Sequence, residues 1–165
     1  GAAAVLHVYD RLRLEAVPRR YTLVPGVPLR ERWPLDAQGR YDLWLLGPNG
    51  FHRHFQGGAR TPAVQASIDH ADGQLRLHLR NLEDSAQPLR MQAGAYAGHM
   101  PEQMLALPAR AETTVAWDAA PTAGWYDLRV SAGESVLRLA GRAEDGRPGT
   151  SDPAMGTEPL RFEHD

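Results

Sequence analysis

Two histidines, His52 and His54, lie at i and i+2 in an apolar stretch, a spacing that places both imidazoles on one face of a β-strand. Such a pair can ligate zinc if a third ligand and orienting groups lie nearby. His7 and His99 are the candidates for the third ligand. A related stretch further along the chain has Arg138 at the position of His54 and lacks a histidine pair. We therefore interpret the pair as polar residues on the solvent side of a hairpin, and predict no metal site.

Asp42 and Asp127 could form a pair of catalytic carboxylates, one acting as acid and the other as base. Each, however, lies within a Gly-x-Tyr-Asp-Leu sequence, with its side chain directed opposite to those of its Tyr and Leu neighbours. Equivalent positions in two repeated segments favour a hydrogen bond that ties a loop. No Ser/His/Asp arrangement and no glycine-rich loop leading into a helix is recognisable. We predict no catalytic residue in this chain.

Arginine lies beside aromatic residues in two segments, residues 19–21 and 30–33. Charge combined with an aromatic ring at an interface can hold a lipid headgroup. Trp33 has a repeat counterpart, Trp117, that lacks flanking arginines, which favours a place for both tryptophans in the core. The candidates for lipid contact are Arg19, Arg20, Tyr21 and Arg32.

The elements that must position these residues occur twice. Gly39–Leu45 (GRYDLWL) returns as Gly124–Val130 (GWYDLRV), about 85 residues later, and each copy follows a tryptophan. Each also leads into a second apolar segment that ends at a glycine, Gly57 or Gly141. A block repeated within one chain indicates a repeated supersecondary unit. Such repetition favours a scaffold or binding module over an enzyme.

Strand patterns dominate the sequence. Leu75–Leu79 alternates apolar and polar residues, as one buried sheet face requires. Asn49-Gly50 and Asp72-Gly73 are hairpin signals, because these residues tolerate positive φ. Only Glu102–Leu107 could form a short helix, limited by flanking prolines. The predicted strands are Val5–Tyr9, Tyr21–Val24, Leu29–Trp33, Tyr41–Leu46, Phe51–Phe55, Val64–Ile68, Leu75–Arg80, Leu89–Ala95, Glu112–Trp117, Trp125–Val130 and Val136–Ala140.

These patterns predict an all-β protein of two tandem Ig-like antiparallel β-sandwich units. Residues 1–60 form the first unit and residues 61–142 the second, followed by an irregular tail at 143–165. The second unit is complete. The first lacks a counterpart of the opening hairpin Val64–Arg80, so part of its apolar face or a strand edge should be uncovered unless the units pack together.

Composition narrows the function classes. All 18 basic residues are arginine, and residues 1–60 carry 9 of them against 5 acidic residues. This excess is weak and forms no basic stripe, so we expect no nucleic-acid partner. No apolar run approaches the roughly 20 residues of a transmembrane helix. The absence of cysteine excludes disulfides and thiolate metal sites.

Several motifs carry a resemblance to a known family. The most specific are the run Gly47–Phe55 (GPNGFHRHF) and the closing Ser151–Gly156 (SDPAMG). With Leu6–Asp10, Pro18–Thr22 and Gly124–Leu128 they span nearly the whole chain. This pattern resembles the C-terminal domain that occurs in tandem at the end of bacterial phospholipases C of the phosphocholine-specific type.

The resemblance implies the distal end of a larger secreted or periplasmic enzyme whose metal-dependent phosphodiesterase domain lies upstream. Nothing in this chain matches that domain, so its active-site residues cannot be placed here, and we expect no cofactor. The leading hypothesis is a non-catalytic accessory region that stabilises or orients the catalytic domain or aids access to lipid. The alternatives are a stand-alone binding module for a lipid surface or carbohydrate, and an esterase centred on the histidine pair.

Overall fold

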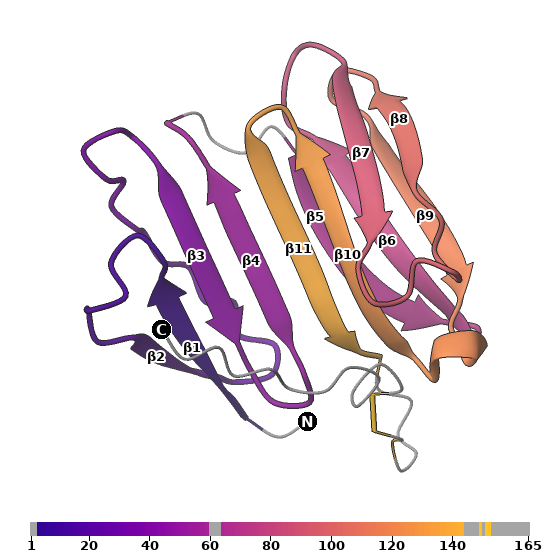
Figure 1. The fold of residues 1–165 in the computed structure, drawn as a ribbon, viewed down its shortest axis with the longest axis horizontal. Helices are drawn as coiled ribbons and strands as arrows, with labels where there is room; N and C mark the ends of the chain where they lie inside the picture. Colours follow the sequence, from indigo (N-terminus) through magenta and orange to yellow (C-terminus); the bar gives the residue numbers. More distant parts are fainter. Residues whose placement is uncertain (1–2, 60–63, 144–148, 150, 153–165) are drawn as a thin grey trace, which may run out of the picture.

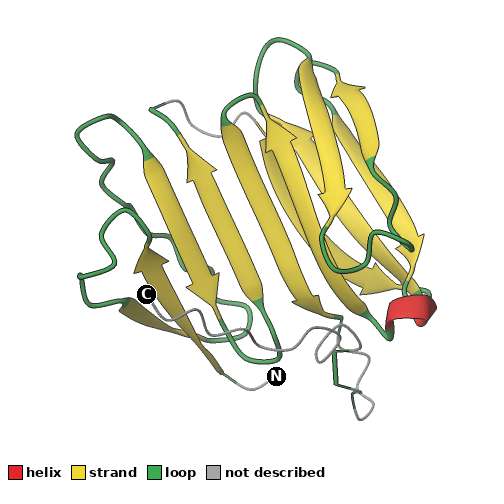
Figure 2. Ribbon diagram, in the orientation of Figure 1, coloured by secondary structure: helices red, strands yellow, loops and turns green. Residues whose placement is uncertain are grey.

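A computed structural model of the chain describes residues 3–59, 64–143, 149, 151 and 152. Nearly all of its regular structure is strand (Figures 1 and 2). The elements are β1 (Ala4–Asp10), β2 (Arg19–Leu23), β3 (Tyr41–Leu46), β4 (His52–Gly57), β5 (Val64–Ala71), β6 (Gln74–Asn81), β7 (Gln87–Ala93), β8 (Gln103–Leu107), β9 (Glu112–Asp118), the 3-10 turn η1 (Ala120–Thr122), β10 (Trp125–Ala132) and β11 (Ser135–Arg142).

The strands form two antiparallel sheets. One has eight strands in the order β2-β1-β3-β4-β11-β10-β7-β8, and the other has three in the order β5-β6-β9. The smaller sheet lies behind the half of the larger sheet that contains β11, β10 and β7 (Figure 1). The prediction of an all-β antiparallel sandwich is confirmed.

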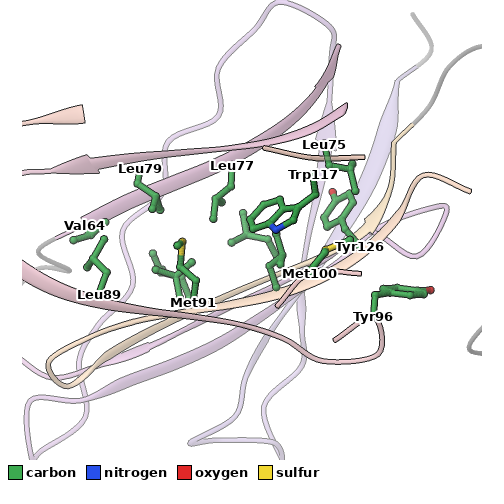
Figure 3. Packing of buried hydrophobic residues seen from close by; sticks show 14 of the residues in the cluster. Val64, Leu75, Leu77, Leu79, Leu89, Met91, Tyr96, Met100, Trp117 and Tyr126 are labelled. Atoms are coloured by element: carbon green, nitrogen blue, oxygen red, sulfur yellow. The ribbon is translucent and has the colours of Figure 1, made fainter. Parts of the chain in front are cut away.

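The core lies between the two sheets in the second unit (Figure 3). Leu75, Leu77 and Leu79 point inward from β6, as their alternation predicts, and each is at most 1% exposed. Trp117 of β9 and Tyr126 of β10 complete the same cluster, both 7% exposed. The prediction that these two repeat aromatics are buried is confirmed.

The predicted hairpins form at the expected turns. Asn49 and Gly50 have φ of 55° and 70° between β3 and β4, and Asp72 and Gly73 have φ of 53° and 76° between β5 and β6. Two successive positive φ values give a turn whose twist matches that of the flanking strands. These turns set the register of both hairpins.

The repeated sequence corresponds to a tyrosine lying over a cross-strand glycine. Tyr41 pairs with Gly57, and Tyr126 pairs with Gly141. A Cβ atom at either glycine would lie 2.5 Å or 3.1 Å from the facing tyrosine hydroxyl oxygen. Both glycines are therefore required by the ring that covers them. Tyr41 occupies the place in the first unit that Tyr126 occupies in the second, as predicted.

The two units share a strand order and meet through equivalent strands. The first runs β2-β1-β3-β4, and the second runs β8-β7-β10-β11, so β4 and β11 are counterparts that pair with each other. Gln56 faces Val136, and His52 faces Ala140, on either side of the central pair His54–Arg138. The junction therefore has an approximate two-fold axis at His54 and Arg138.

Two predicted elements are wrong. Leu29–Trp33 is not a strand, although its counterpart β9 is one. In the second unit β9 pairs with β6, and the described residues of the first unit include no counterpart of β6 for this segment to pair with. Trp33 consequently lies in a loop and is only half-buried. Glu102–Leu107 does not form a helix, because β7 pairs with Gln103–Leu107 as strand β8.

The first unit contributes no strand to the smaller sheet within the described residues. The core-facing side chains of β3 are accordingly less buried: Leu43 and Leu45 are half-buried, whereas their counterparts Leu128 and Val130 are each 1% exposed. On β1, Leu6 and Val8 are buried, at 8% and 4% exposure. The predicted boundary at residues 60 and 61 and most of the tail at 143–165 lie outside the described residues.

Candidate functional site

The polar residues of the eight-stranded sheet gather on the face opposite the core. Tyr9, Trp44, His54, Arg138 and Arg129 are register partners in succession across β1, β3, β4, β11 and β10. Residues in such a row project to the same side of the sheet. The row crosses from one unit to the other at the pair of His54 and Arg138.

In the first unit this face carries a polar contact across the β3–β4 hairpin, between Asp42 and His54. The Oδ1 atom of Asp42 lies 2.6 Å from His54 Nε2, and its Oδ2 atom lies 3.2 Å from Arg11 Nη1. The Arg11 guanidinium also stacks over the Trp44 ring at 4.3 Å. The edges of His52 and His54 meet the same indole, with ring centroids 5.8 Å and 6.0 Å away. Asp42 is only 7% exposed.

The second unit has the counterpart of this pair. The Nε and Nη2 atoms of Arg138 donate to the two carboxylate oxygens of Asp127 at 2.7 Å and 2.8 Å. These hydrogen bonds raise the pKa of Arg138 above its usual value. A side chain at position 94 would collide with the Asp127 carboxylate, so Gly94 is needed there. A bidentate arginine–carboxylate pair is among the stronger polar contacts of a protein.

The predicted loop ties at the two aspartates are therefore correct only in part. Asp42 holds the start of the β1–β2 loop through Arg11, but its shorter contact is with His54 on the neighbouring strand. Asp127 pairs with Arg138 on the adjacent strand. The sequence contains a signal for these pairs, because a basic residue follows the aspartate by 12 positions in one copy and by 11 in the other.

His52 lies next to this row in a partly buried position. Its Nε2 atom is buried without a hydrogen-bond partner among the described residues. Burial lowers the pKa of His52 below its usual value, and the nearby charges of Arg138 and His54 lower it further. The neutral imidazole is therefore the form that the folded chain favours.

The geometry around the histidine pair does not assemble a metal site. His7 lies on β1, with β3 between it and β4, and His99 lies in the β7–β8 loop. Across residues 3–59 and 64–143, no group of three or more His, Asp or Glu side chains is placed to hold a metal ion. The aspartate pairs, Asp42 with His54 and Asp127 with Arg138, link neighbouring strands within the two hairpins.

The candidates for lipid contact lie at the opposite end of the first unit. Arg19, Arg20 and Tyr21 belong to β2, an edge strand, and Arg32 lies in the loop that follows it. The guanidinium of Arg19 stacks over the Trp33 ring at 4.2 Å, which holds this loop against β2. The structure thus brings β2 and the segment 24–35 into one surface.

Residues 11–35, which are β2 with the loop on either side of it, are named the β2 surface. It carries six arginines and two glutamates. It also carries seven of the ten large hydrophobic residues that are exposed in the described chain, whereas residues 64–143 contribute only Met104. The most exposed is Val17, at 89%. The apolar members are Leu12, Leu14, Val17, Val24, Val27, Leu29 and Leu35.

The closing sequence motif has a structural partner in the second unit. The hydroxyl of Tyr96, in the β7–β8 loop, donates to the carboxylate of Asp152. This contact and the burial of the phenol raise the pKa of Tyr96. In Figure 3 the Tyr96 ring points away from the core cluster. Asp152 therefore anchors the start of the tail to the second unit. The rest of the motif, residues 153–156, lies outside the described residues.

No helix in the described part of the chain has the length and apolarity needed to cross a bilayer.

Comparison with known proteins shows that both repeat units match the same family. The model for "Bacterial phospholipase C, C-terminal domain" matches residues 1–58 and again residues 62–142. A "Non-hemolytic phospholipase C" of Pseudomonas aeruginosa is 35% identical over 173 residues, which cover 98% of this chain and 25% of that protein. A protein of the same name from Burkholderia pseudomallei is 33% identical, over 94% of this chain and 23% of its own length.

A "Hemolytic phospholipase C" of Pseudomonas aeruginosa is 34% identical over 131 residues, which cover 73% of this chain and 18% of that protein. The chain thus spans about a quarter or less of the length of these relatives. With both of its repeat units matched by the family model, the chain belongs to the family of bacterial phospholipase C C-terminal domains.

Proposed function

We propose that this chain is a non-catalytic accessory region of a secreted or periplasmic phospholipase C-like enzyme, and that its first unit brings the enzyme to lipid through the β2 surface. The catalytic phosphoesterase domain would be supplied by polypeptide outside this chain, since the chain spans only 25% of the Pseudomonas non-hemolytic relative. No residue of the chain takes part in the chemical step.

The observation that carries the proposal is the gathering of exposed apolar side chains and arginines on one surface. Soluble proteins rarely expose contiguous apolar patches without a partner. Arginine among exposed valine and leucine side chains suits the boundary of an anionic lipid surface, where the cation meets headgroups and the apolar groups enter the acyl region. Of the six arginines in residues 11–35, Arg11, Arg13 and Arg19 pair with Asp42, Asp10 and Glu31, so the positive charge would come mainly from Arg20, Arg30 and Arg32.

The contacts of Asp42 and Asp127 on the outer face support a non-catalytic role. Asp42 contacts Arg11 and His54, and Asp127 contacts Arg138 in a bidentate pair. Both carboxylates are therefore already engaged by basic side chains of the chain itself. These side chains link adjacent strands of the sheet.

The test is vesicle binding by the whole chain. We expect it to cosediment with vesicles of phosphatidylcholine and phosphatidylglycerol more strongly than with phosphatidylcholine alone, and to lose binding as salt is raised. At about 1 kcal/mol for each basic residue near an anionic surface, the double variant Arg20→Gln/Arg32→Gln should bind about 30-fold more weakly. Leu14→Ser/Val17→Ser should lower the affinity for both vesicle types.

The control is Met104→Ser, which removes an exposed apolar side chain from the second unit and should leave vesicle binding unchanged. Equal binding by the wild type and by Arg20→Gln/Arg32→Gln would show that the arginines do not contact lipid. Failure of the wild type to bind either vesicle would refute the lipid role. A parent enzyme that melts at lower temperature when residues 11–35 are altered would then point to contact with the catalytic domain.

A further inference from the structure

We propose that the free edge of β5 and the core-facing side of β3 and β4 form an acceptor site for a β-hairpin of the β5–β6 type, contributed by polypeptide outside residues 1–165. The bound hairpin would add strands beside β5 and extend the smaller sheet under the first unit. This inference does not depend on the proposed contact with lipid.

The approximate two-fold axis at the junction locates the acceptor site. In the second unit the β5–β6 hairpin and β9 cover β11, β10 and β7. The axis exchanges β11 with β4 and β10 with β3, since β4 and β11 pair symmetrically about His54 and Arg138. Applied to the β5–β6 hairpin, it places an equivalent hairpin under β4 and β3. That position is directly beside β5.

The edge of β5 is available for pairing. Among the described strands β5 pairs only with β6, so its other edge presents unpaired backbone groups. An edge of this kind is a template for another strand. An open pocket of about 560 Å³ adjoins it, and its lining includes Val64 and Ala66 from β5, Phe55 from β4 and Leu137 from β11. The rest of the lining is largely polar and comes mostly from β5, β6 and β9, so these four apolar side chains are the part that suits the inward side of an added strand.

The first unit also has incompletely buried residues where the hairpin would pack. Leu43, Leu45 and Phe55 are half-buried, whereas their counterparts in the second unit lie beneath the β5–β6 hairpin at 1–3% exposure. The segment Leu29–Trp33 corresponds to β9 but has no strand to pair with among the described residues. A bound hairpin would cover the half-buried side chains of β3 and β4 and would give Leu29–Trp33 a strand to pair with.

The chemistry of the occupant follows from β6, which has leucines at 75, 77 and 79 on its core face and polar residues on the other. The partner must therefore be a two-stranded hairpin with one alternating apolar face. Polypeptide outside this chain is the source because the relatives extend well beyond the matched region, which is 25% of the Pseudomonas non-hemolytic protein.

The register defines a direct experiment. Val8 faces Leu45, and Met91 faces the counterpart residue Val130, so Ala4 corresponds to Gln87. A variant of the whole chain would carry a copy of residues 62–86 immediately before Ala4, in place of residues 1–3. The matched control has the same extension with the copies of Leu75, Leu77 and Leu79 changed to serine, which keeps its length and its Asp-Gly turn.

We expect the added hairpin to raise the melting temperature by about 5 °C or more relative to the control. Backbone amides of residues 29–33 should become protected from hydrogen exchange, a change that general stabilisation of the second unit would not produce. Equal melting temperatures for the two variants, with residues 29–33 still unprotected, would overturn the proposal. It would also be overturned if the unmodified chain were a dimer with those amides already protected, because a second copy would then occupy the site.

Discussion

The two units of this chain use the same four-stranded arrangement, yet within the described residues only the second is backed by strands of the smaller sheet. Each orders its strands equivalently, places a tyrosine over a glycine, and pairs the following aspartate with a basic residue. In the second unit β5, β6 and β9 cover this arrangement and bury its leucines. The repeat therefore encodes four strands of the larger sheet in each unit, while the burial of their side chains depends on a neighbouring layer.

The junction explains how the first unit is held although, in the part of the chain that the structure describes, it contributes no strand to the smaller sheet. β4 extends the sheet of the second unit by pairing with β11, and Phe55 packs against the second unit's core. Arg53 also donates across the junction to the Ala140 carbonyl at 2.8 Å and to the Tyr126 hydroxyl at 3.0 Å. The local stability of the first unit's strands should therefore decrease from β4, at the junction, to β2, at the far edge of the sheet.

The repeated tryptophans should give the largest difference between the units. Trp117→Ala removes a ring that is 7% exposed and should lower the free energy of unfolding by about 3–5 kcal/mol. Trp33→Ala removes a half-buried ring stacked on Arg19 and should cost about 1 kcal/mol. Denaturant titration of both variants measures this comparison. Similar losses would mean that the first unit buries its tryptophan in a core of its own.

Substituting the two tyrosine-covered glycines by alanine should give a smaller difference in stability loss between the units. Gly141→Ala places a Cβ against buried Tyr126 at a φ of 154°, so we expect a loss of about 1–3 kcal/mol. Gly57→Ala also meets a tyrosine, but Tyr41 is half-buried and can move aside. Its cost should be smaller. Melting curves of the two variants test the ranking, and a larger loss for Gly57→Ala would contradict the difference in packing.

The smallest expected effect is the contribution of His52 to the pH dependence of stability. Its pKa is lowered in the folded chain by burial and by the charge of Arg138, whereas in the unfolded chain it is near 6.5. The unfolded state then binds more protons, so stability is lost as the pH falls below about 6.5 and levels off beneath the folded pKa. His52→Gln should have a flatter stability profile between pH 7 and pH 5 in urea titrations. An unchanged profile would show that His52 does not contribute.

Local signals account for most of the strands and turns. Asn49-Gly50 and Asp72-Gly73 encode their hairpins through backbone conformation alone, and the leucines of β6 encode its buried face by alternation. Glu102–Leu107 is short and flanked by prolines, so its pattern cannot separate helix from strand, and pairing with β7 decides the outcome. Leu29–Trp33 is the opposite case: it has the pattern of a strand but no strand to pair with among the described residues, and it remains a loop.

The row of side chains around His54 and Arg138 on the outer face illustrates what the sequence leaves open. The spacing of His52 and His54 predicts a shared face, which the structure bears out through their common contact with Trp44. The proximity of His54 to Arg138 depends on edge-to-edge pairing of strands more than 80 residues apart. No local pattern specifies that register. The repeat does specify which residues are equivalent. The equivalence of Asp42 with Asp127 and of His54 with Arg138 therefore predicts both aspartate pairs.

The central structural claim is that the two units form one continuous sheet through β4 and β11. Native-state hydrogen exchange tests it most directly, because amides in different parts of a sheet report their own opening free energies. We predict that β4 amides facing β11 open with nearly the free energy of global unfolding, shared with β10 and β11, while β2 opens at distinctly lower free energy. If β4 instead exchanged as readily as β2, with β11 fully protected, the units would be separate and the account would be contradicted.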